Sequence, residues 1–233
     1  MIDFHSHILP GIDDGSDSVE TSLSMLRMEA EQGVRKVVAT PHFYARYQSP
    51  EEFLRKREAS EKALRKAMAG EKDLPELCVG AEVYFFRGIS ESEFLPKMAI
   101  KGTNCVMIEM PPAPWEEAIY RELIRIREKT GLIPVIAHMD RYIGPFRTFR
   151  IPEHLAELPV LVQANGDFFL NRPTAGLAMK LVKRGRIHLL GSDCHNLSSR
   201  KPNVGLAMEQ ILRKSGHGIQ EKFARYEAIV FEF

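Results

Sequence analysis

The first fifteen residues of the chain hold two histidines and two aspartates close together. The apolar segment Met1–Phe4 leads into His5 and His7, and Asp13 and Asp14 follow shortly after. Residues i and i+2 of a strand point to the same side, so a strand here aims both imidazoles at one point. Neutral imidazole is the commonest metal ligand, and carboxylates add oxygen donors. The alternative interpretation is a pair of surface histidines beside an acidic turn.

Length and composition set the class of protein. A chain of 233 residues with 44% hydrophobic residues can bury a substantial core, so we expect residues 1–233 to form a single domain. The formal charge is only +1, which argues against a nucleic-acid partner, because binding a phosphate backbone requires a basic surface. No apolar run reaches the roughly eighteen residues of a membrane span, so we expect no membrane insertion.

The N-terminus and the cysteines indicate a compartment. The start MIDFHSH lacks the basic and apolar regions of a signal peptide. Cys78, Cys105 and Cys194 are an odd number of cysteines with no disulfide or CxxC pattern. Both features predict a reduced, cytoplasmic protein.

Strand and helix patterns alternate along the chain. Apolar, β-branched segments predict strands, and amphipathic segments with capping residues predict helices. The predicted strands are residues 1–4, 34–40, 76–86, 105–110, 133–138, 160–165 and 187–191. The predicted helices are residues 18–33, 49–70, 91–99, 114–130, 173–185 and 203–214. Strands that alternate with helices in this way predict an α/β fold with a parallel sheet.

Histidines and acids stand at or just past the C-terminal ends of most predicted strands. They are His5, His7, His42, Glu82, Glu109, His138, Asp193 and His195. In parallel barrels this end of the strands carries the functional groups. Five of the eight histidines lie there, and His154, His188 and His217 do not. Each residue alone could be structural, as Glu109 would be if it were a paired core acid, but together they predict a metal centre.

The number and type of donors indicate the chemistry. Five imidazoles and four carboxylates, counting Asp14, are too many for one ion, and with one bridging carboxylate they can hold two or three. Nitrogen and oxygen donors without thiolate suit manganese, iron or zinc. Paired ions about 3.5–4 Å apart clamp the attacking and leaving oxygens of a phosphoryl displacement. The donor set therefore predicts hydrolysis of a phosphate ester.

Five motifs resemble those of the PHP (polymerase and histidinol phosphatase) superfamily. They are HSHILPGIDDG at 5–15, TPH at 40–42, GAE at 80–82, VIAHMDRY at 135–142 and GSDCHN at 191–196. More narrowly, the chain resembles the bacterial manganese-dependent tyrosine-protein phosphatases, the CpsB-like group of capsule and exopolysaccharide operons. The resemblance runs from Met1 to about Pro202. It implies a distorted (β/α)7 barrel with a trinuclear centre of Mn²⁺, with Fe or Zn as alternatives. The implied partner is a phosphotyrosine-bearing protein, the tail of an autophosphorylated bacterial tyrosine kinase.

The same resemblance assigns residues to ions by position. The implied ligands of the first ion are His5, His7, Glu82 and Asp193. The implied second ion shares Glu82 and adds Glu109 and His138. The implied third ion takes Asp14, His42 and His195.

Two arginines are the implied substrate contacts, and a neighbouring aspartate departs from the family pattern. Arg141 matches the arginine that engages the substrate phosphate, and Arg200 would be a second basic contact. The family usually reads H-x-E-R-Y where this chain has Asp140. Asp140 or another acid near the metals could donate the proton to the leaving group, and the sequence does not decide between them.

Three other functions compete with this hypothesis. Cys194 and Arg200 match the C-x5-R spacing of cysteine-dependent tyrosine phosphatases, but the residues between them include no glycine for a phosphate-binding loop. A PHP-type phosphatase of histidinol phosphate or another small metabolite is the main alternative. A non-catalytic PHP scaffold is a further alternative, although such a module would be expected to lose ligands.

Two segments near the predicted site carry aromatic and basic residues. The loop Phe43–Tyr47 follows His42 and could form a wall that receives an aromatic ring, or it could simply pack on the sheet. Arg147, in the segment 146–150, is a candidate contact to phosphate or peptide.

Overall fold

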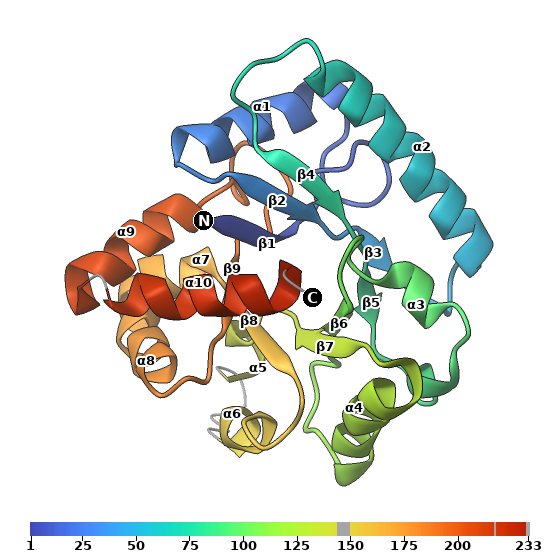
Figure 1. Ribbon diagram of the computed structural model, residues 1–233, viewed down its shortest axis with the longest axis vertical. Coiled ribbons are helices and arrows are strands. Elements are labelled where there is room, and N and C mark those ends of the chain that lie inside the picture. The colour runs from blue at the N-terminus through green and yellow to red at the C-terminus, as the bar shows by residue number, and fades with distance from the viewer. Residues whose placement is uncertain (144–149, 217, 232–233) are drawn as a thin grey trace.

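Parallel strands form a curled sheet in the middle of the molecule, and helices surround it (Figure 1). The computed structural model describes residues 1–143, 150–216 and 218–231. The strands are β1 (Ile2–Ser6), β2 (Lys36–Ala39), β3 (His42–Phe43), β4 (Glu76–Val79), β5 (Glu82–Tyr84), β6 (Cys105–Glu109), β7 (Ile133–Ile136), β8 (Leu161–Asn165) and β9 (Leu189–Gly191). The α/β class with a parallel sheet is confirmed.

The helices follow the strands along the chain. They are α1 (Val19–Glu31), α2 (Pro50–Met68), α3 (Leu95–Met98), α4 (Glu117–Thr130), α5 (Asp140–Ile143), α6 (Arg150–Leu155), α7 (Gly166–Leu170), α8 (Arg172–Lys183), α9 (Val204–Ser215) and α10 (Gly218–Phe231). A 3-10 turn spans Ile89–Glu91. None of these helices is long and apolar enough to cross a membrane.

All strand pairs are parallel, and backbone hydrogen bonds join the two groups of strands. One group has the order β1-β2-β4 and the other the order β3-β5-β6-β7-β8-β9. The Gly80 N–H donates to the Ala39 carbonyl (2.8 Å), and the Glu82 N–H donates to the Pro41 carbonyl (3.0 Å), so the pairing of β2 with β4 continues into that of β3 with β5. Beyond β9, the Asp193 N–H donates to the carbonyl of His5 on β1 (2.7 Å). The strands therefore follow one another around the centre of the molecule.

Two predicted strands are interrupted in the structure. Residues 34–40 become β2, with β3 beyond Pro41, and residues 76–86 become β4 and β5. Pro41 has no N–H to donate to a strand ladder, so the pairing breaks there. A Cβ at Gly80 would lie 3.0 Å from the side chain of Ile100 and 3.2 Å from its Cα, so a larger residue would crowd the close approach of the two segments. The predicted strand boundaries were wrong at these two points.

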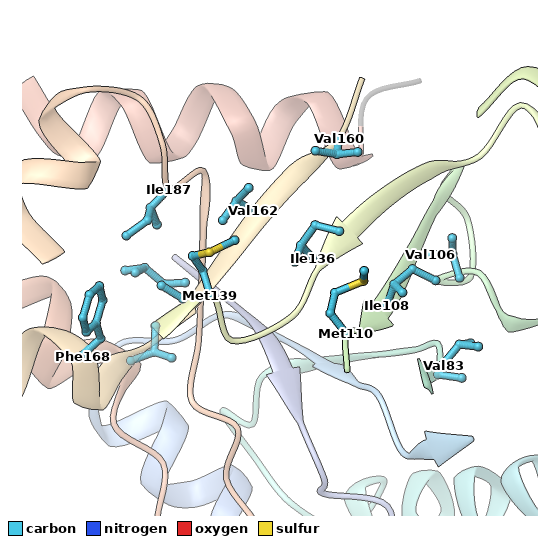
Figure 2. Close-up of a cluster of buried hydrophobic side chains, with 14 of the residues drawn as sticks. Val83, Val106, Ile108, Met110, Ile136, Met139, Val160, Val162, Phe168 and Ile187 are labelled. Atoms are coloured by element: carbon cyan, nitrogen blue, oxygen red, sulfur yellow. The ribbon is translucent and has the colours of Figure 1, made fainter. Parts of the chain in front are cut away.

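Alternate residues of each strand separate an outer core from an inner one. Val106 and Ile108 of β6 face outward and pack with apolar residues such as Ile136 and Val162 in the cluster of Figure 2. The alternate residues Cys105 and Met107 belong to a separate inner cluster. Side chains of a strand alternate between its two faces, so the next inward position of β6 is Glu109.

The inner cluster fills the N-terminal half of the strands, and donors occupy the C-terminal half. Its buried members are Phe4, Val38, Cys78, Ile100, Cys105, Met107, Val135, Ala137, Leu161, Leu189 and Val230. On β8 the inward series runs from Leu161 to Gln163 and Asn165, and so from apolar to polar. The apolar half supports the polar half from beneath.

Helix α10 lies across the N-terminal side of the strands, in front of them in Figure 1. Its Val230 is buried in the inner cluster, and Phe231 stacks near Phe4 with ring centroids 5.9 Å apart. The sequence prediction assigned no element to this C-terminal segment. The helices α5, α6 and α7 were also not predicted.

Replacing Phe4 by alanine tests the inner cluster. Phe4 is 1% exposed, and removal of a buried phenyl ring leaves a cavity, so we expect a loss of about 3–5 kcal/mol in unfolding free energy. Urea unfolding at one fixed Mn²⁺ concentration measures it. Leu206→Ala, at a side chain that is 44% exposed, is the control and should change stability by less than about 0.5 kcal/mol. Equal losses in the two variants would contradict the buried position of Phe4.

Candidate metal centre

Four side chains direct donor atoms to one point at the C-terminal end of the sheet. They are His5 and His7 from β1 and the segment after it, Glu82 from β5, and Asp193 from the segment after β9. His5 Nε2 and His7 Nε2 lie 3.1 Å apart. Glu82 Oε2 lies 3.3 Å and 3.4 Å from these nitrogens, and Asp193 Oδ1 lies 3.7 Å and 3.5 Å from them. Donors that share one ion at about 2.0–2.2 Å lie roughly 3–3.6 Å apart, so His5, His7 and Asp193 fit one cation. Glu82 adds a carboxylate oxygen close to both histidine nitrogens.

Glu82 connects this first group of donors to a second. Its other oxygen, Oε1, lies 2.8 Å from His138 Nε2. Glu109 Oε1 lies 3.7 Å from the same nitrogen, and Glu109 Oε2 lies 3.8 Å from His42 Nδ1. Because its two oxygens face different groups, Glu82 can bridge two ions.

A third group lies on the more exposed side of the centre. Asp14 Oδ1 lies 3.6 Å from His42 Nε2 and 3.5 Å from His195 Nε2. The ring of His7 lies between them, with centroids 4.4 Å from that of His42 and 3.9 Å from that of His195. The structure thus brings all nine sequence-predicted ligands into one region.

Several buried polar atoms in this region have no hydrogen-bond partner among the described residues. They are His42 Nδ1, Glu82 Oε2, His138 Nδ1 and His195 Nε2. His42 Nδ1 and Glu82 Oε2 lie 2.9 Å apart but are not aligned for a hydrogen bond. A buried polar atom without a partner is costly, and a bound cation would satisfy most of these. The donor set therefore fits two or three metal ions.

The electrostatics of the centre favour added positive charge. Burial alone would lower the pKa of His7, but the hydrogen bond to Asp13 and the charge of Glu82 raise it to about 10. Burial would raise the pKa of Glu82, but the positive charge of His5 and the hydrogen bond from His138 hold it well below its usual value. A site that attracts protons this strongly will also attract metal cations.

Outer hydrogen bonds hold the histidine rings in place. His7 Nδ1 pairs with Asp13 Oδ2 at 2.7 Å, and His5 Nδ1 pairs with Gln163 Oε1 at 3.2 Å. His195 Nδ1 pairs with the backbone carbonyl of Asp193 at 2.9 Å. With Nδ1 occupied, each ring directs Nε2 to the centre, an arrangement common to metal-binding histidines.

The sequence prediction missed the two side chains that hold these rings, Asp13 and Gln163. Asp13 also accepts the backbone N–H of His42 (3.0 Å), and Gln163 accepts that of His138 (2.6 Å). The pair of aspartates at 13–14 was a signal for the first residue. No sequence signal marked Gln163.

Tight backbone packing is required at two glycines of the centre. A Cβ at Gly191 would lie 2.5 Å from the Cβ of His5, and one at Gly15 would lie 2.2 Å from the His7 carbonyl oxygen. His138 and Asp193 adopt positive φ values of 30° and 53°. Non-glycine residues rarely do so, and such strain is typical of functional sites. The fold accepts it at two of the proposed ligands.

A buried pair of acids joins β1 to the segment after β9. Asp3 accepts hydrogen bonds from the backbone N–H groups of His5 (3.1 Å) and Ser192 (2.9 Å) and from the Ser192 hydroxyl (2.5 Å). The carboxyl group of Glu29, on α1, is buried against Asp3. Burial and the nearby charge of Asp3 raise the pKa of Glu29 well above 4.5, so Glu29 keeps its proton to a higher pH than an exposed glutamate does.

The two predicted arginines lie on either side of Asp193. Arg141 Nη2 donates to Asp193 Oδ2, and Arg200 Nη2 donates to Asp193 Oδ1 at 2.8 Å. Both guanidinium groups are partly exposed. They line a small cavity of about 220 Å³ together with Asp140, whose Oδ1 accepts the Asn165 N–H (2.9 Å). Burial raises the pKa of Asp140.

The thiol of Cys194 does not suit nucleophilic catalysis. Cys194 is fully buried in the apolar core, and burial and the charges of Asp3 and Glu29 raise its pKa well above 9. A catalytic thiolate requires a lowered pKa and access to substrate. The Cys-x5-Arg pattern is therefore a coincidence of spacing.

The other histidines lie elsewhere. His188 Nδ1 accepts the Val162 N–H at the N-terminal end of β9, and His154 stacks on Tyr120. His217 and Arg147 lie outside the described residues.

Comparison with known proteins identifies the family. Residues 1–229 match the family model for capsular polysaccharide synthesis, CpsB/CapC. The chain belongs to the CpsB/CapC family. Among its relatives, the tyrosine-protein phosphatase CpsB of Streptococcus pneumoniae is 30% identical over 93% of this chain and 91% of that protein. The tyrosine-protein phosphatase YwqE of Bacillus subtilis is 28% identical over 93% of this chain and 85% of that protein.

A solved structure supports the fold. It comes from work on YwqE of Bacillus subtilis and CpsB of Streptococcus pneumoniae, described as unique metal-dependent tyrosine phosphatases. It matches this CpsB/CapC chain with a TM-score of 0.87 and 24% identity, over 100% of this chain and 94% of the other.

The acid pair of this CpsB/CapC chain predicts a pH-dependent stability. The folded protein keeps the proton of Glu29 at pH values where the unfolded chain releases it, near 4.5. The unfolded state then binds fewer protons, so this group lowers stability as pH rises above about 4.5. Glu29→Gln removes that dependence, and its stability relative to the wild type should rise between pH 5 and 8.

Urea unfolding at several pH values, at one Mn²⁺ concentration, measures this difference. Glu31→Gln, an exposed position on the same helix, is the control and should show no such trend. A Glu29→Gln difference that stays constant with pH would contradict the protonated state of Glu29.

Proposed function

We propose that this chain is a metal-dependent phosphomonoester hydrolase that removes phosphate from the phosphotyrosine of a protein. Its curated relatives are named tyrosine-protein phosphatases. The observation that carries the proposal is the meeting of two histidines and two acids: carboxylate oxygens of Glu82 and Asp193 lie 3.3–3.7 Å from the Nε2 atoms of His5 and His7, which are 3.1 Å apart. Their distance in the sequence makes this convergence hard to explain by core packing alone.

The proposed ion sites follow the three groups of donors. The proposed ligands of the first are His5, His7, Glu82 and Asp193, those of the second are Glu82, Glu109 and His138, and those of the third are Asp14, His42 and His195. Mn²⁺ is the metal we propose, because imidazole and carboxylate donors without thiolate suit it, with Fe or Zn as alternatives. When bound, such ions supply Lewis-acid activation of the phosphate and lower the pKa of water.

Arg141 and Arg200 are the proposed phosphate contacts. Both already pair with Asp193, so they lie beside the proposed ions, and their partial exposure lets them reach a substrate. A guanidinium group donates two parallel hydrogen bonds to phosphate oxygens, which orients the ester and stabilises charge in the transition state.

Asp140 is the proposed proton donor to the leaving group. Its buried carboxyl group lines the same cavity as Arg141, and its raised pKa favours the protonated form. The phenol of tyrosine has a pKa of about 10, so hydrolysis of phosphotyrosine makes a weaker demand on a general acid than hydrolysis of phosphoserine does.

The biological setting follows from the family. We propose that the phosphotyrosine lies on the tail of a bacterial tyrosine kinase that regulates capsule or exopolysaccharide synthesis. The three cysteines are free and buried, which agrees with our proposal that the protein works in the cytoplasm.

Two further proposals concern the architecture. If β2 with β3 and β4 with β5 are each counted as one bent strand, the nine strands become seven. This count supports our proposal that the fold is a distorted (β/α)7 barrel. One inner cluster shared by most strands supports a single domain over residues 1–233.

Metal removal tests the proposed function. The purified protein should hydrolyse p-nitrophenyl phosphate and phosphotyrosyl peptides with Mn²⁺, and EDTA should lower turnover at least about 100-fold, because the ions supply several kcal/mol of stabilisation. Asp193→Asn should have a similar effect. Added Mn²⁺ should restore the EDTA-treated wild type.

Cys194→Ser is the matched control and should retain most activity. Loss of turnover in Cys194→Ser, together with resistance to EDTA, would overturn the metal mechanism. Turnover of histidinol phosphate without turnover of phosphotyrosine would overturn the substrate assignment and favour a metabolite phosphatase.

A further inference from the structure

A cavity lined by aromatic side chains adjoins the candidate metal centre. Its volume is about 670 Å³, within the usual range of roughly 300–1,000 Å³ for ligand sites. We call it the aromatic cavity, and its main lining residues are Tyr44, Arg46, Tyr47, Tyr84, Phe85 and Phe86. They come from the segment after β3 and from β5 and the segment after it.

Tyr44 joins the aromatic cavity to the metal centre. Its hydroxyl donates to Glu109 Oε2 at 3.4 Å, and its ring centroid lies 5.2 Å from that of His42. On its other side, the Tyr44 ring lies 5.5 Å from that of Tyr84. The cavity therefore begins one side chain away from the proposed ligands.

Packing on the sheet does not explain the aromatic side chains that line the aromatic cavity. Tyr47 is 79% exposed, and Tyr84 and Phe86 are only partly buried. The guanidinium of Arg46 lies 5.8 Å from the Tyr47 ring centroid. Aromatic faces left open to solvent beside a polar centre are typical of a binding site.

The apolar surface continues away from the metal centre. Phe85 and Phe86 also line a second cavity of about 530 Å³, which includes Pro111, Pro114 and Ile119. A small metabolite would leave most of this surface uncovered. A peptide that carries the phosphorylated residue would cover it.

We propose that the aromatic cavity receives the ring of a phosphotyrosine residue, which lies against Tyr44 and Tyr84 while its phosphate occupies the metal centre. This inference rests on the proposed function and assigns its specificity. In an aryl phosphate a single oxygen joins the ring to the phosphate, so the ring must lie directly beside the centre. Aromatic pairs favour ring centroids about 4.5–7 Å apart, and both tyrosines line the cavity with partly exposed side chains that can make such contacts.

Two inhibitors distinguish binding of the aromatic ring from binding of the anion. Inorganic phosphate presents only the anion, and phenylphosphonate adds an aromatic ring. In Tyr84→Ala, the inhibition constant of phenylphosphonate should rise about tenfold, because an aromatic contact is lost. The inhibition constant of inorganic phosphate should stay within about twofold, because phosphate does not touch the ring site. The assay uses the Mn²⁺-loaded enzyme and the ester that it hydrolyses fastest.

Three control variants show whether an effect comes from the lost ring contact or from disruption of the fold. Tyr47→Ala alters an exposed side chain that cannot support the core. It should also raise the inhibition constant of phenylphosphonate. Tyr84→Phe keeps the ring and should retain wild-type inhibition. Tyr226→Ala, at a tyrosine that stacks on His188 at the other end of the strands, should alter neither constant.

Unchanged inhibition by phenylphosphonate in both Tyr84→Ala and Tyr47→Ala would overturn the inference. An equal rise for phosphate and phenylphosphonate would also overturn it, because that result indicates damage to the metal centre. Failure of the proposed function would give a different result from failure of this inference. The wild type itself would then hydrolyse an alkyl ester such as histidinol phosphate and leave phosphotyrosyl peptides intact.

Discussion

The buried negative charge of Glu82 is the constraint on which the rest of the centre depends. Its carboxylate is fully buried, and imidazole nitrogens of His5, His7, His42 and His138 lie within 3.4 Å of its two oxygens. A buried charge is stable only when opposite charge compensates it, and neutral imidazoles do not supply that charge. Protons can supply part of it, as the raised pKa of His7 shows, and metal cations can supply all of it. The carboxylate that makes the site costly without cations is also the group best placed to bridge two of them.

The architecture separates the support of this site from its chemistry. On β6 and β8 the inward positions are apolar near the N-terminal end and polar near the C-terminal end, so one packed cluster supports the polar residues from beneath. Helix α10 covers that cluster from the N-terminal side. Hydrogen bonds that Asp13 and Gln163 accept then fix the histidine rings, and Asp3 ties β1 to the segment after β9. Loops on the opposite side remain free to present Arg141, Arg200 and the aromatic cavity to a substrate.

Much of this arrangement could be predicted from the sequence, because strand ends are visible as the points where apolar runs stop. His5, Glu109 and His138 each follow such a run, and parallel strands bring these ends together. The residues that were missed act through contacts between distant segments. Gln163 lies within a buried strand and looks like any polar residue there, and Glu29 lies on an amphipathic helix. The bends at Pro41 and Gly80 depend on what the chain meets in space, so the strand boundaries there could not be read from propensity.

The central claim is that scattered histidines and acids hold several ions around Glu82. The most direct measurement is the number of manganese ions retained per chain after loading and desalting, determined by elemental analysis for the wild type and for Glu82→Ala. We expect two or three ions in the wild type and at most one in the variant, with both proteins folded by circular dichroism. Fewer than one ion in the wild type, or an unchanged number in Glu82→Ala, would contradict it.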